Sequence, residues 1–580
     1  MNIAKVHIKG FRSLEDVEVD VTDYTCLIGK NDCGKSSFLR ALHILFDPQE
    51  KLSQDDLCKF RSNTSEPCFV EAVLENCQHS MAVRGKLRIR RIMQLGSSQW
   101  QAQCNVPQSQ LLRDMSEGDC TKSKINEAKQ NSTLNSTLCD LIEDHITNVA
   151  PNGRATKENW REIYSRIQNS DLIEWENGWA SFNSDELQSL VQVVFLKADM
   201  RAAEEVDDNN RSVFGRVAGF LLKDALSKHS KITEARKVLE HELQQIVKDS
   251  QKKWPIDELN EIEELFHNEV AKFDENVRTE CDFIAPRLPI FEFGVRIKIS
   301  DNCVEGLDKM GHGLQRSVVF AMLRIHHTLK TKQNSPQGVE NSQPLYLFLA
   351  EEPELYLHPQ AERQRKKELV ELSRLLDAQV VLCTHSAIFV DLAEFKGILR
   401  FSRPERTQTM VTCFQGDELN DDDKKAFNAI YWFDPNRAAM LFADHVILTE
   451  GETEKIIVPA LAERDGIDIT NVEIVDCGGN GNIPTYQKVL EGFGVKYVAW
   501  LDTDAQREVN KARDARTSAG LGKIILTPGD WEEMTEVTVI GRESKSQKGW
   551  EHFILRGNEP NDATIARIRA AYNWEDYETA

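Results

Sequence analysis

Long hydrophobic runs, paired cysteines and an excess of positive charge are all missing from this sequence. No apolar stretch approaches the about 20 residues that a membrane-spanning helix needs, and Lys5, Lys9 and Arg12 interrupt the start, where a signal peptide would be apolar. The 13 cysteines include no CxxC pair, which favours reduced thiols over disulfides or a zinc knuckle. We therefore expect a cytoplasmic protein.

The charge balance limits how the chain can bind phosphate. Acidic residues outnumber basic ones by 93 to 71, which gives a net charge of −22. This excludes a cationic coat that would grip nucleic acid everywhere, so phosphate binding must depend on local sites. With 580 residues, of which 41% are hydrophobic, the chain can fill the cores of about three or four domains.

The first 46 residues predict a phosphate loop. Alternating apolar residues in 1–23 indicate two strands, the apolar stretch 24–28 runs into Gly29, and residues 36–46 have the spacing of a helix. Between strand and helix, Gly29-Lys-Asn-Asp-Cys-Gly34-Lys35-Ser36 fits GxxxxGK[ST]. Its backbone N–H groups can surround phosphates, Lys35 can neutralise them, and the Ser36 hydroxyl can bind Mg²⁺. Asn31, within this motif, and Ser37, directly after it, are further candidates to hold the nucleotide.

A second acidic element lies far downstream. An apolar strand at 345–350 delivers Glu351 and Glu352, and a helix over 359–376 leads to another strand at 380–383, the alternation of a mostly parallel sheet. One carboxylate can hold Mg²⁺ and the next can orient the attacking water. An acidic helix N-terminus would explain the acids but not the strand that presents them.

The 275 residues between Ser36 and Gly311 are too many for one crossover, so they must include an inserted subdomain. Residues 105–190 are polar and helix-rich, and two amphipathic helices flank Trp254-Pro255 over 232–278. This helical hairpin packs on its own domain or joins two subunits. In the strand region 68–92, alternation puts the cations of 86–91 on one face, which is either a solvated face or a nucleic-acid contact.

After a charged stretch and a helical join near 424–443, the sequence predicts a second α/β domain with strands at 446–448, 472–475 and 497–501. Glu450 and Glu454 lie four residues apart where a helix begins, and Asp502 and Asp504 follow another strand. Such clustered carboxylates need cations, and oxygen ligands predict Mg²⁺ or Mn²⁺ rather than zinc. Two solvated acidic turns are the alternative.

The first half resembles the ABC-type ATPases of RecF, SMC and OLD proteins. The resemblance lies in the phosphate loop and in Ile8-Lys-Gly-Phe-Arg-Ser-Leu14, Met310-Gly-His-Gly-Leu-Gln-Arg316, Glu351-Glu-Pro-Glu-Leu-Tyr-Leu-His-Pro359 and Thr384-His385-Ser386. It implies a signature motif, with Gly313 and Gln315, that reaches the nucleotide of a second head, so the active form is a homo-oligomer. It also implies a catalytic Glu352 and a γ-phosphate-sensing His385. Glu351 stands where many relatives have Asp, and the signature reads GHGLQ rather than SGGQ.

The second half resembles the Toprim domain. Glu450-Gly-Glu-Thr-Glu454 matches its first motif, Asp502-Thr-Asp504 matches its DxD motif, and Asp476-Cys-Gly-Gly-Asn480 lies at the turn between them. In the nucleases of that family a later acid and a lysine complete the centre. Glu532, in Asp530-Trp-Glu532, matches the acid in position, and Lys545 or Lys548 matches the lysine, with Lys548 favoured.

Together the two halves resemble the OLD (overcoming lysogenisation defect) nucleases. The resemblance implies an ATP-regulated, metal-dependent DNA endonuclease in anti-phage defence, with DNA as substrate and with a partner such as a Gabija helicase or a retron reverse transcriptase. The alternative is a non-cleaving, ATP-driven DNA clamp or scaffold. A topoisomerase is disfavoured because only 76 residues follow Asp504, and a primase because no zinc module is present.

The expected fold class is α/β, an ABC/RecF-like ATPase sheet with a helical insertion, followed by a smaller doubly wound parallel-sheet Toprim domain. The expected domains are 1–104 and 291–415 for the ATPase, 105–290 for the insertion with an ATPase segment near 191–205, 416–443 for a linker, and 444–580 for the Toprim domain.

Overall fold

The computed structural model describes most of the chain outside one long central segment. Apart from a few isolated residues, the described ranges are 1–58, 67–94, 97–130, 136–149, 155–167, 175–198, 344–375, 377–391, 395–404, 407–414, 435–503, 506–516, 520–528, 534–537 and 544–577. The expected helices of 232–278 and the signature residues Gly313 and Gln315 lie outside them. No described helix is long and apolar enough to cross a membrane.

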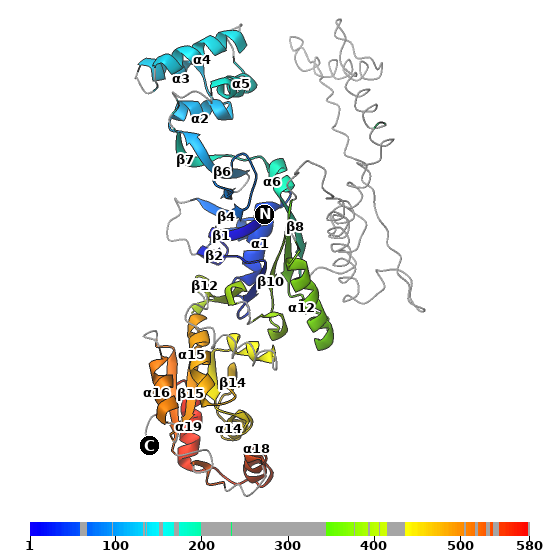
Figure 1. The fold of residues 1–580 in the computed structure, drawn as a ribbon, viewed down its shortest axis with the longest axis vertical. Coiled ribbons are helices and arrows are strands. Elements are labelled where there is room, and N and C mark those ends of the chain that lie inside the picture. The colour runs from blue at the N-terminus through cyan, green and yellow to red at the C-terminus, as the bar shows by residue number, and fades with distance from the viewer. Residues whose placement is uncertain are drawn as a thin grey trace, which may run out of the picture. The chain divides into compact units, whose positions relative to one another are not determined.

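Two six-stranded sheets build the N-terminal part (Figure 1). The first is antiparallel, in the order β2-β1-β4-β5-β6-β7, with strands β1 (Asn2–Phe11), β2 (Leu14–Asp20), β4 (Cys68–Glu75), β5 (Leu87–Gln94), β6 (Ser97–Pro107) and β7 (Trp175–Ser181). The second has the order β12-β11-β3-β10-β9-β8, with β3 (Tyr24–Ile28), β8 (Val191–Leu196), β9 (Leu345–Glu351), β10 (Ala378–Cys383), β11 (Ile398–Ser402) and β12 (Met410–Cys413). All neighbours in it are parallel except β11 and β12.

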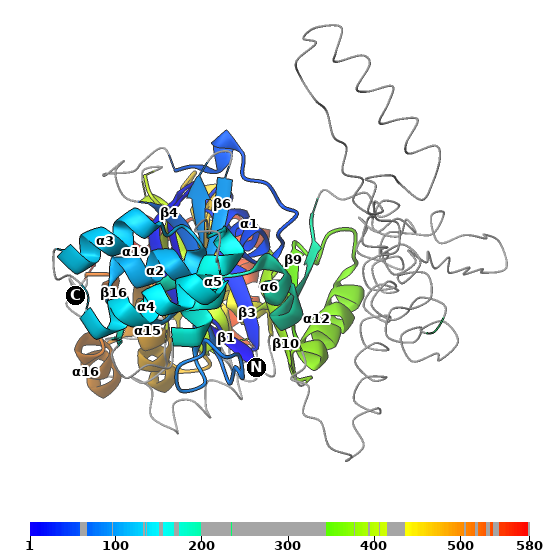
Figure 2. The same cartoon turned by 90° about the horizontal axis from the view of Figure 1, so that it is seen from above.

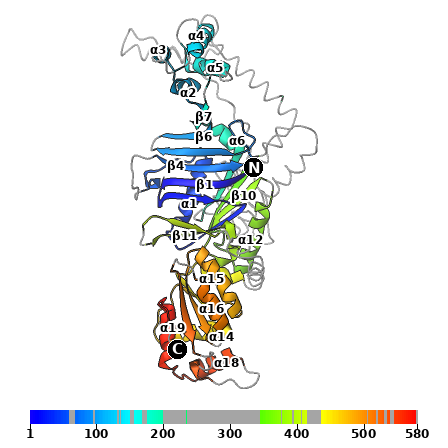
Figure 3. The same cartoon turned by 60° about the vertical axis from the view of Figure 1, so that its left-hand side comes forward.

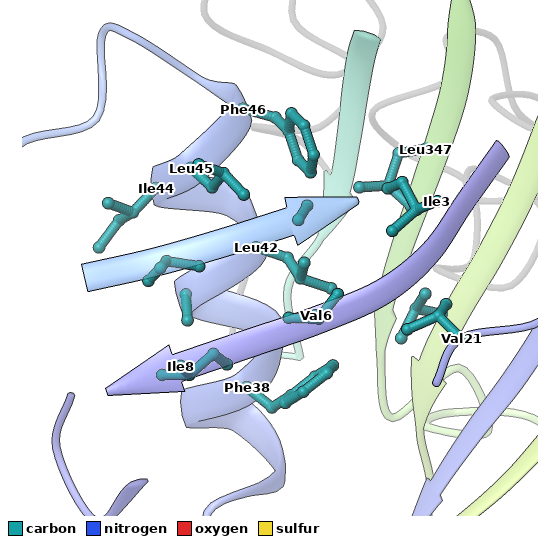
Figure 4. Close-up of a cluster of buried hydrophobic side chains, with 14 of the residues drawn as sticks. Ile3, Val6, Ile8, Val21, Phe38, Leu42, Ile44, Leu45, Phe46 and Leu347 are labelled. Atoms are coloured by element: carbon teal, nitrogen blue, oxygen red, sulfur yellow. The ribbon is translucent and has the colours of Figure 1, made fainter. Parts of the chain in front are cut away.

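Helix α1 (Lys35–Phe46) lies between these sheets and joins their cores. Figure 4 shows Phe38, Leu42 and Leu45 of α1 in the same cluster as Val6 of β1 and Leu347 of β9. Burying such side chains supplies about 1.5–3 kcal/mol each, which fixes α1, and with it the loop that precedes it, against the sheet. Helix α12 (Pro359–Ser373) packs on β10 and β3, and ends three residues earlier than expected.

The polar segment after β6 forms a helical lobe with its own core. It contains α2 (Gln110–Glu117), α3 (Lys122–Gln130), α4 (Ser136–Val149) and α5 (Lys157–Ile167), which lie together in Figure 2 around buried Leu112, Ile142 and Trp160. The helix-rich pattern of 105–190 did not predict β7, which pairs with β6 and returns the chain to the first sheet. Helix α6 (Ser184–Leu190) then leads into β8.

The cations of β5 do not share one face, and this corrects the prediction from alternation. Arg91 is only 3% exposed and donates hydrogen bonds to carbonyls at the C-terminal end of α1, while Arg88 and Arg90 lie on the opposite face. Arg88 forms an ion pair with Glu71, and the Arg90 guanidinium stacks 3.8 Å from the ring centre of Trp179. The two outward cations therefore have partners within the sheet.

The C-terminal part is a doubly wound domain around a four-stranded parallel sheet (Figure 3). Its strand order is β14-β13-β15-β16, with β13 (His445–Thr449), β14 (Val472–Asp476), β15 (Lys496–Asp502) and β16 (Gly522–Thr527). Helices α14 (Glu452–Arg464) and α19 (Asp562–Tyr572) share one core with the sheet, whereas α15 (Ile483–Gly492) packs on β13 and β15 and against α16 (Gln506–Asp514). The expected strands all form. Of the expected helical join, the described part is a 3₁₀ turn, η6 (Pro435–Leu441), rather than an α-helix.

Candidate nucleotide and nuclease sites

The phosphate loop depends on two glycines. Gly29 has φ +136°, and an added Cβ would lie 2.1 Å from the carbonyl oxygen of Phe401 on the neighbouring strand β11. Gly34 has φ +100°, and its Cβ would lie 2.7 Å from the Thr409 hydroxyl and 2.8 Å from that of Ser13. Glycine at both positions lets the backbone turn tightly where a side chain would collide, so α1 begins with its first N–H groups at the loop.

Lys35 is held by the loop that it serves. Its Nζ donates to the carbonyl oxygens of Gly29 and Lys30, each at 2.7 Å. Burial lowers the pKa of this lysine, and nearby acids including Glu352 oppose that shift. A bound phosphate would offer the ammonium group stronger, charged acceptors in place of the two carbonyls.

The acids after β9 are placed differently from one another. Glu351, the last residue of β9, accepts a 3.4 Å hydrogen bond from the backbone N–H of Ala198. Glu352 follows with φ +46°, and its N–H donates to the carbonyl of Cys383 on β10. A glutamate in the left-handed region is strained, and such strain is typical of functional sites.

Glu354 is a site residue that the sequence analysis did not single out. One of its carboxylate oxygens accepts the backbone N–H of His385 at 2.7 Å, and the other is buried without a hydrogen-bond partner in the described structure. Burial raises the pKa of Glu354, whereas burial and the charge of Lys35 lower that of His385. The repeated acids of Glu351-Glu-Pro-Glu354 were the available signal, but only the neighbouring strand β10 reveals its partner.

One cavity of about 1580 Å³ brings the expected nucleotide-binding residues together. Its lining includes Gly29, Asn31, Gly34, Lys35, Ser36, Ser37, Glu352 and His385. Glu351 is not among the lining residues. Asp444, Lys496 and Trp574, from the C-terminal domain, also line this cavity, and Lys30 of the loop forms an ion pair with Asp444. The volume is ample for a nucleoside triphosphate.

Three of the expected nuclease acids, Glu450, Glu454 and Asp502, lie at the carboxyl edge of the C-terminal sheet. Glu450 lies between β13 and the N-cap of α14, Gly451. One of its carboxylate oxygens accepts the backbone N–H of Asp502 at 3.0 Å, and its carbonyl accepts the N–H of Gly479 at 2.7 Å. The ends of three neighbouring strands are thereby tied to Glu450.

Glu454 and Asp476 complete the described acidic group. Glu454 is only 7% exposed, and burial together with the charges of Glu450 and Asp476 raises its pKa to about 7. Asp476 ends β14, directly beside the end of β13, and accepts the N–H of Gly478 at 2.7 Å. The sequence analysis assigned Asp476 to a turn and not to the site, because its proximity to Glu454 depends on β14 pairing with β13.

The described acids fit a divalent cation. Their donors are all carboxylate oxygens, and burial first, then the neighbouring charges of Glu450 and Asp476, makes the ionised form of Glu454 unfavourable without a cation. Asp504 and Glu532 lie outside the described residues. Lys545 and Lys548 lie on α18 (Lys545–Gly549), which packs on α14, and the Lys548 ammonium is 3.7 Å from the Glu551 carboxylate.

A tighter cluster elsewhere is a structural one. Among the described parts of the chain, three potential ligand atoms lie within 4.8 Å of one another only at His43, Asp47 and Glu50, so the nuclease acids are less closely gathered than this group. Arg40 donates to the Glu50 carboxylate at 2.5 Å, and Arg91 donates to the carbonyls of Asp47 and Glu50. These guanidinium groups already supply the positive charge that a metal would bring.

Comparison with known proteins agrees with this division. The family described as AAA ATPase domain matches residues 1–390, and the family described as overcoming lysogenization defect protein-like, TOPRIM domain, matches residues 441–504. The chain is similar to the Old nuclease of Escherichia phage P2, with 22% identity over 521 residues that cover 87% of this chain and 77% of that protein.

Two further relatives match different lengths of the chain. The OLD nuclease of Thermus scotoductus is 28% identical over 227 residues, which are 38% of this chain and 40% of that protein. Endonuclease GajA of Bacillus cereus is 20% identical over 569 residues, which are 96% of this chain and 84% of that protein. The chain therefore belongs to the AAA ATPase domain family and, with its OLD-like TOPRIM domain, to the ATPase–Toprim proteins of the OLD family.

Proposed function

We propose that this protein is an ATP-regulated, divalent-metal-dependent DNA endonuclease that acts in the cytoplasm in defence against phage. The observation that carries the proposal is the hydrogen bond from Asp502 to Glu450, because it joins the two acidic motifs at one sheet edge. The relatives named as nucleases support the activity, and the relative named GajA supports the role in defence. A non-cleaving clamp would leave the crowded acids without a purpose.

In this proposal, Glu450, Glu454, Asp502, Asp504 and Glu532 hold Mg²⁺ or Mn²⁺. The bound cations would polarise the scissile phosphate and the water that attacks it. Asp502 and its backbone N–H orient the Glu450 carboxylate, and Glu454 gives up its proton when a cation arrives. Lys548 offsets the negative charge that develops on the phosphate.

ATP binds in the cavity at the phosphate loop. Lys35 exchanges its carbonyl partners for phosphate oxygens, Ser36 holds Mg²⁺, Glu352 orients water, and His385 senses the γ-phosphate. Glu351 does not line the cavity, so it would hold that Mg²⁺ through water. Gly313 and Gln315 reach the nucleotide of a second head, so the active protein is a homo-oligomer formed through its ATPase heads and helical insertion. A helicase, or a reverse transcriptase with its DNA, is the proposed defence partner.

Contacts between the ATPase and the C-terminal domain support regulation by ATP. Lys30, inside the phosphate loop, forms an ion pair with Asp444, and Arg400 on β11 donates to the carbonyls of Leu441 and Gly494. Asp444 immediately precedes β13, the strand that ends one residue before Glu450. A change at the loop therefore has a short, stiff route to the nuclease centre.

The test is conversion of supercoiled plasmid to nicked circles with Mg²⁺ or Mn²⁺, with and without ATP. We expect cutting by the wild-type protein and by Asp514→Asn, an exposed acid at the end of α16, but not by Glu450→Ala or Asp502→Asn. Asp502→Asn keeps the backbone N–H that holds Glu450, so the site stays assembled while a ligand is lost. Intact plasmid under every condition with the wild-type protein would refute nuclease activity, and cutting by Asp502→Asn would place the centre elsewhere.

A further inference from the structure

The segment after the candidate catalytic lysine exposes apolar side chains. Within the described ranges, five large hydrophobic residues are exposed, and two of them are Trp550, at 40%, and Leu555, at 71%. Both belong to η8 (Trp550–Leu555), a π-helical turn that closes with a hydrogen bond from the Arg556 N–H to the Glu551 carbonyl. Such wide turns are rare and are often found at functional sites.

Cations surround these apolar side chains. Residues 545–556, which we call the Trp550 surface, include Lys545, Lys548 and Arg556 but a single acid, Glu551. The segment has a net charge of +2 in a chain whose net charge is −22. Glu551 is shared between Arg556, at 2.6 Å, and Lys548, at 3.7 Å. The segment has more cations than acids, which makes it attractive to a polyanion.

The Trp550 surface is anchored to the helix that carries part of the nuclease centre. Phe553 is 1% exposed and lies in the core that contains Ile457 and Leu461 of α14. Arg464, at the end of α14, donates to the carbonyl of Phe553 at 2.8 Å. Glu454 lies in the first turn of the same helix, so the Trp550 surface is fixed to the scaffold of the acidic group.

An exposed indole among cations suits nucleic acid better than a protein partner. Protein interfaces are depleted in lysine around their aromatic anchors, whereas proteins that bind unpaired strands combine cations on the backbone with aromatic rings on the bases. Stacking of one base on such a ring contributes about 1–3 kcal/mol. In this segment the exposed Trp550 lies between Lys548 and Arg556 along the chain, whereas Phe553 is buried.

We propose that the Trp550 surface binds the DNA strand that is cut, with Trp550 stacked on an unpaired base of that strand and Lys545 and Arg556 on the flanking phosphates. This rests on the proposed nuclease function. It adds to that function a preference for DNA in which a base is free to leave its stack, such as a gap, a flap or a distorted duplex. Fully paired DNA would lack the stacked base.

The test measures binding of a fluorescein-labelled gapped duplex and of the same duplex without the gap, by fluorescence anisotropy in Ca²⁺ to prevent cutting. Trp550→Ala should weaken binding of the gapped duplex about tenfold, whereas the affinity of Trp550→Phe should stay within about threefold of wild type. The affinities for the gapped and the fully paired duplex should differ only when residue 550 is aromatic. Met410→Ala removes another exposed large hydrophobic side chain, from β12, and should not change DNA affinity.

A second readout does not depend on a folded variant. With wild-type protein and DNA carrying 5-iododeoxyuridine in the gap, ultraviolet cross-linking should yield a DNA-linked peptide containing Trp550. Unchanged DNA affinity in Trp550→Ala, or cross-links confined to other peptides, would overturn this proposal. The proposed nuclease function would still stand if the wild-type protein cut DNA. A change in oligomeric mass of Trp550→Ala with unchanged DNA affinity would assign the surface to contacts between copies instead. Wild-type protein that neither binds nor cuts DNA would refute the proposed function itself.

Discussion

The backbone N–H of Asp502 donates a 3.0 Å hydrogen bond to the carboxylate of Glu450, although 52 residues separate them in the chain. Parallel pairing of β13 with β15 brings their carboxyl ends to one edge and makes this contact possible. The two acidic motifs are therefore parts of one site. The same edge gathers Glu454 and Asp476, so the crowding of charge is a property of the fold and not of either motif alone.

Lys35→Ala should abolish nucleotide binding and leave the nuclease centre intact. The Lys35 ammonium donates to two loop carbonyls, which phosphate oxygens would replace. Each charge-assisted bond to phosphate contributes about 1.5–3 kcal/mol. Loss of one such bond lowers the affinity for a fluorescent ATP analogue by about tenfold to a hundredfold, and loss of several abolishes detectable binding. Lys86→Ala is the matched control, because the Lys86 side chain is exposed, pairs with Glu75 and does not line the nucleotide cavity. Equal affinity in wild type and Lys35→Ala would show that the loop is not the nucleotide site.

Gly34→Ala should destabilise the ATPase more than Gly85→Ala does. Both glycines have positive φ, so alanine costs about 1–2 kcal/mol at either position, but at Gly34 the new Cβ also collides with the hydrogen-bonded hydroxyls of Thr409 and Ser13. At Gly85 nothing lies within 4 Å of the added Cβ. Thermal unfolding should show a larger loss for Gly34→Ala, together with weaker nucleotide binding. Equal losses would mean that the loop relaxes freely.

Divalent-cation binding at the nuclease centre should weaken as pH falls through 7. The pKa of Glu454 is raised to about 7, so below that pH its carboxyl carries a proton that the cation must displace. In the metal-free protein the raised pKa makes the ionised carboxyl unfavourable, so stability is lost as pH rises towards 7, and bound metal restores it. Apparent Mg²⁺ affinity from calorimetry should drop by up to about tenfold per pH unit below 7.

Glu454→Gln is the control for this pH dependence. Glutamine cannot titrate, so the Mg²⁺ affinity of this variant should be lower than that of the wild type and should change less with pH between about pH 6 and about pH 8. If both proteins showed the same slope, the proton would belong to another group.

The strands that carry the sites were predictable because they are buried on both faces. β9, β10, β13 and β15 are nearly continuous apolar runs, and β9, β13 and β15 each end at an acidic or polar residue. β7 was missed because Trp175–Ser181 shows no clear alternation, and its pairing with β6 spans the whole helical lobe. Its Trp179 stacks on Arg90, an interaction visible only in three dimensions.

Two site residues could not be predicted from the sequence, because their positions depend on which strands are neighbours in the sheet. Asp476 approaches Glu454 because β14 is the neighbour of β13, and strand order cannot be read from local patterns. Glu354 holds the backbone of His385 because β9 pairs with β10 in a fixed register. Conversely, the strand, loop and helix of the phosphate loop were predictable because they are consecutive in the sequence, whereas the approach of Phe401 to Gly29 and of Thr409 to Gly34 was not.

The most direct test of the central claim is an anomalous-difference map from crystals of the full chain grown with Mn²⁺. The account predicts at least one Mn²⁺ peak about 2.0–2.3 Å from carboxylate oxygens of both Glu450 and Asp502, and loss of that peak in Glu450→Ala. The contradicting result, at a Mn²⁺ concentration that supports cutting, would be Mn²⁺ peaks only at other places, with the Glu450 and Asp502 carboxylates facing apart.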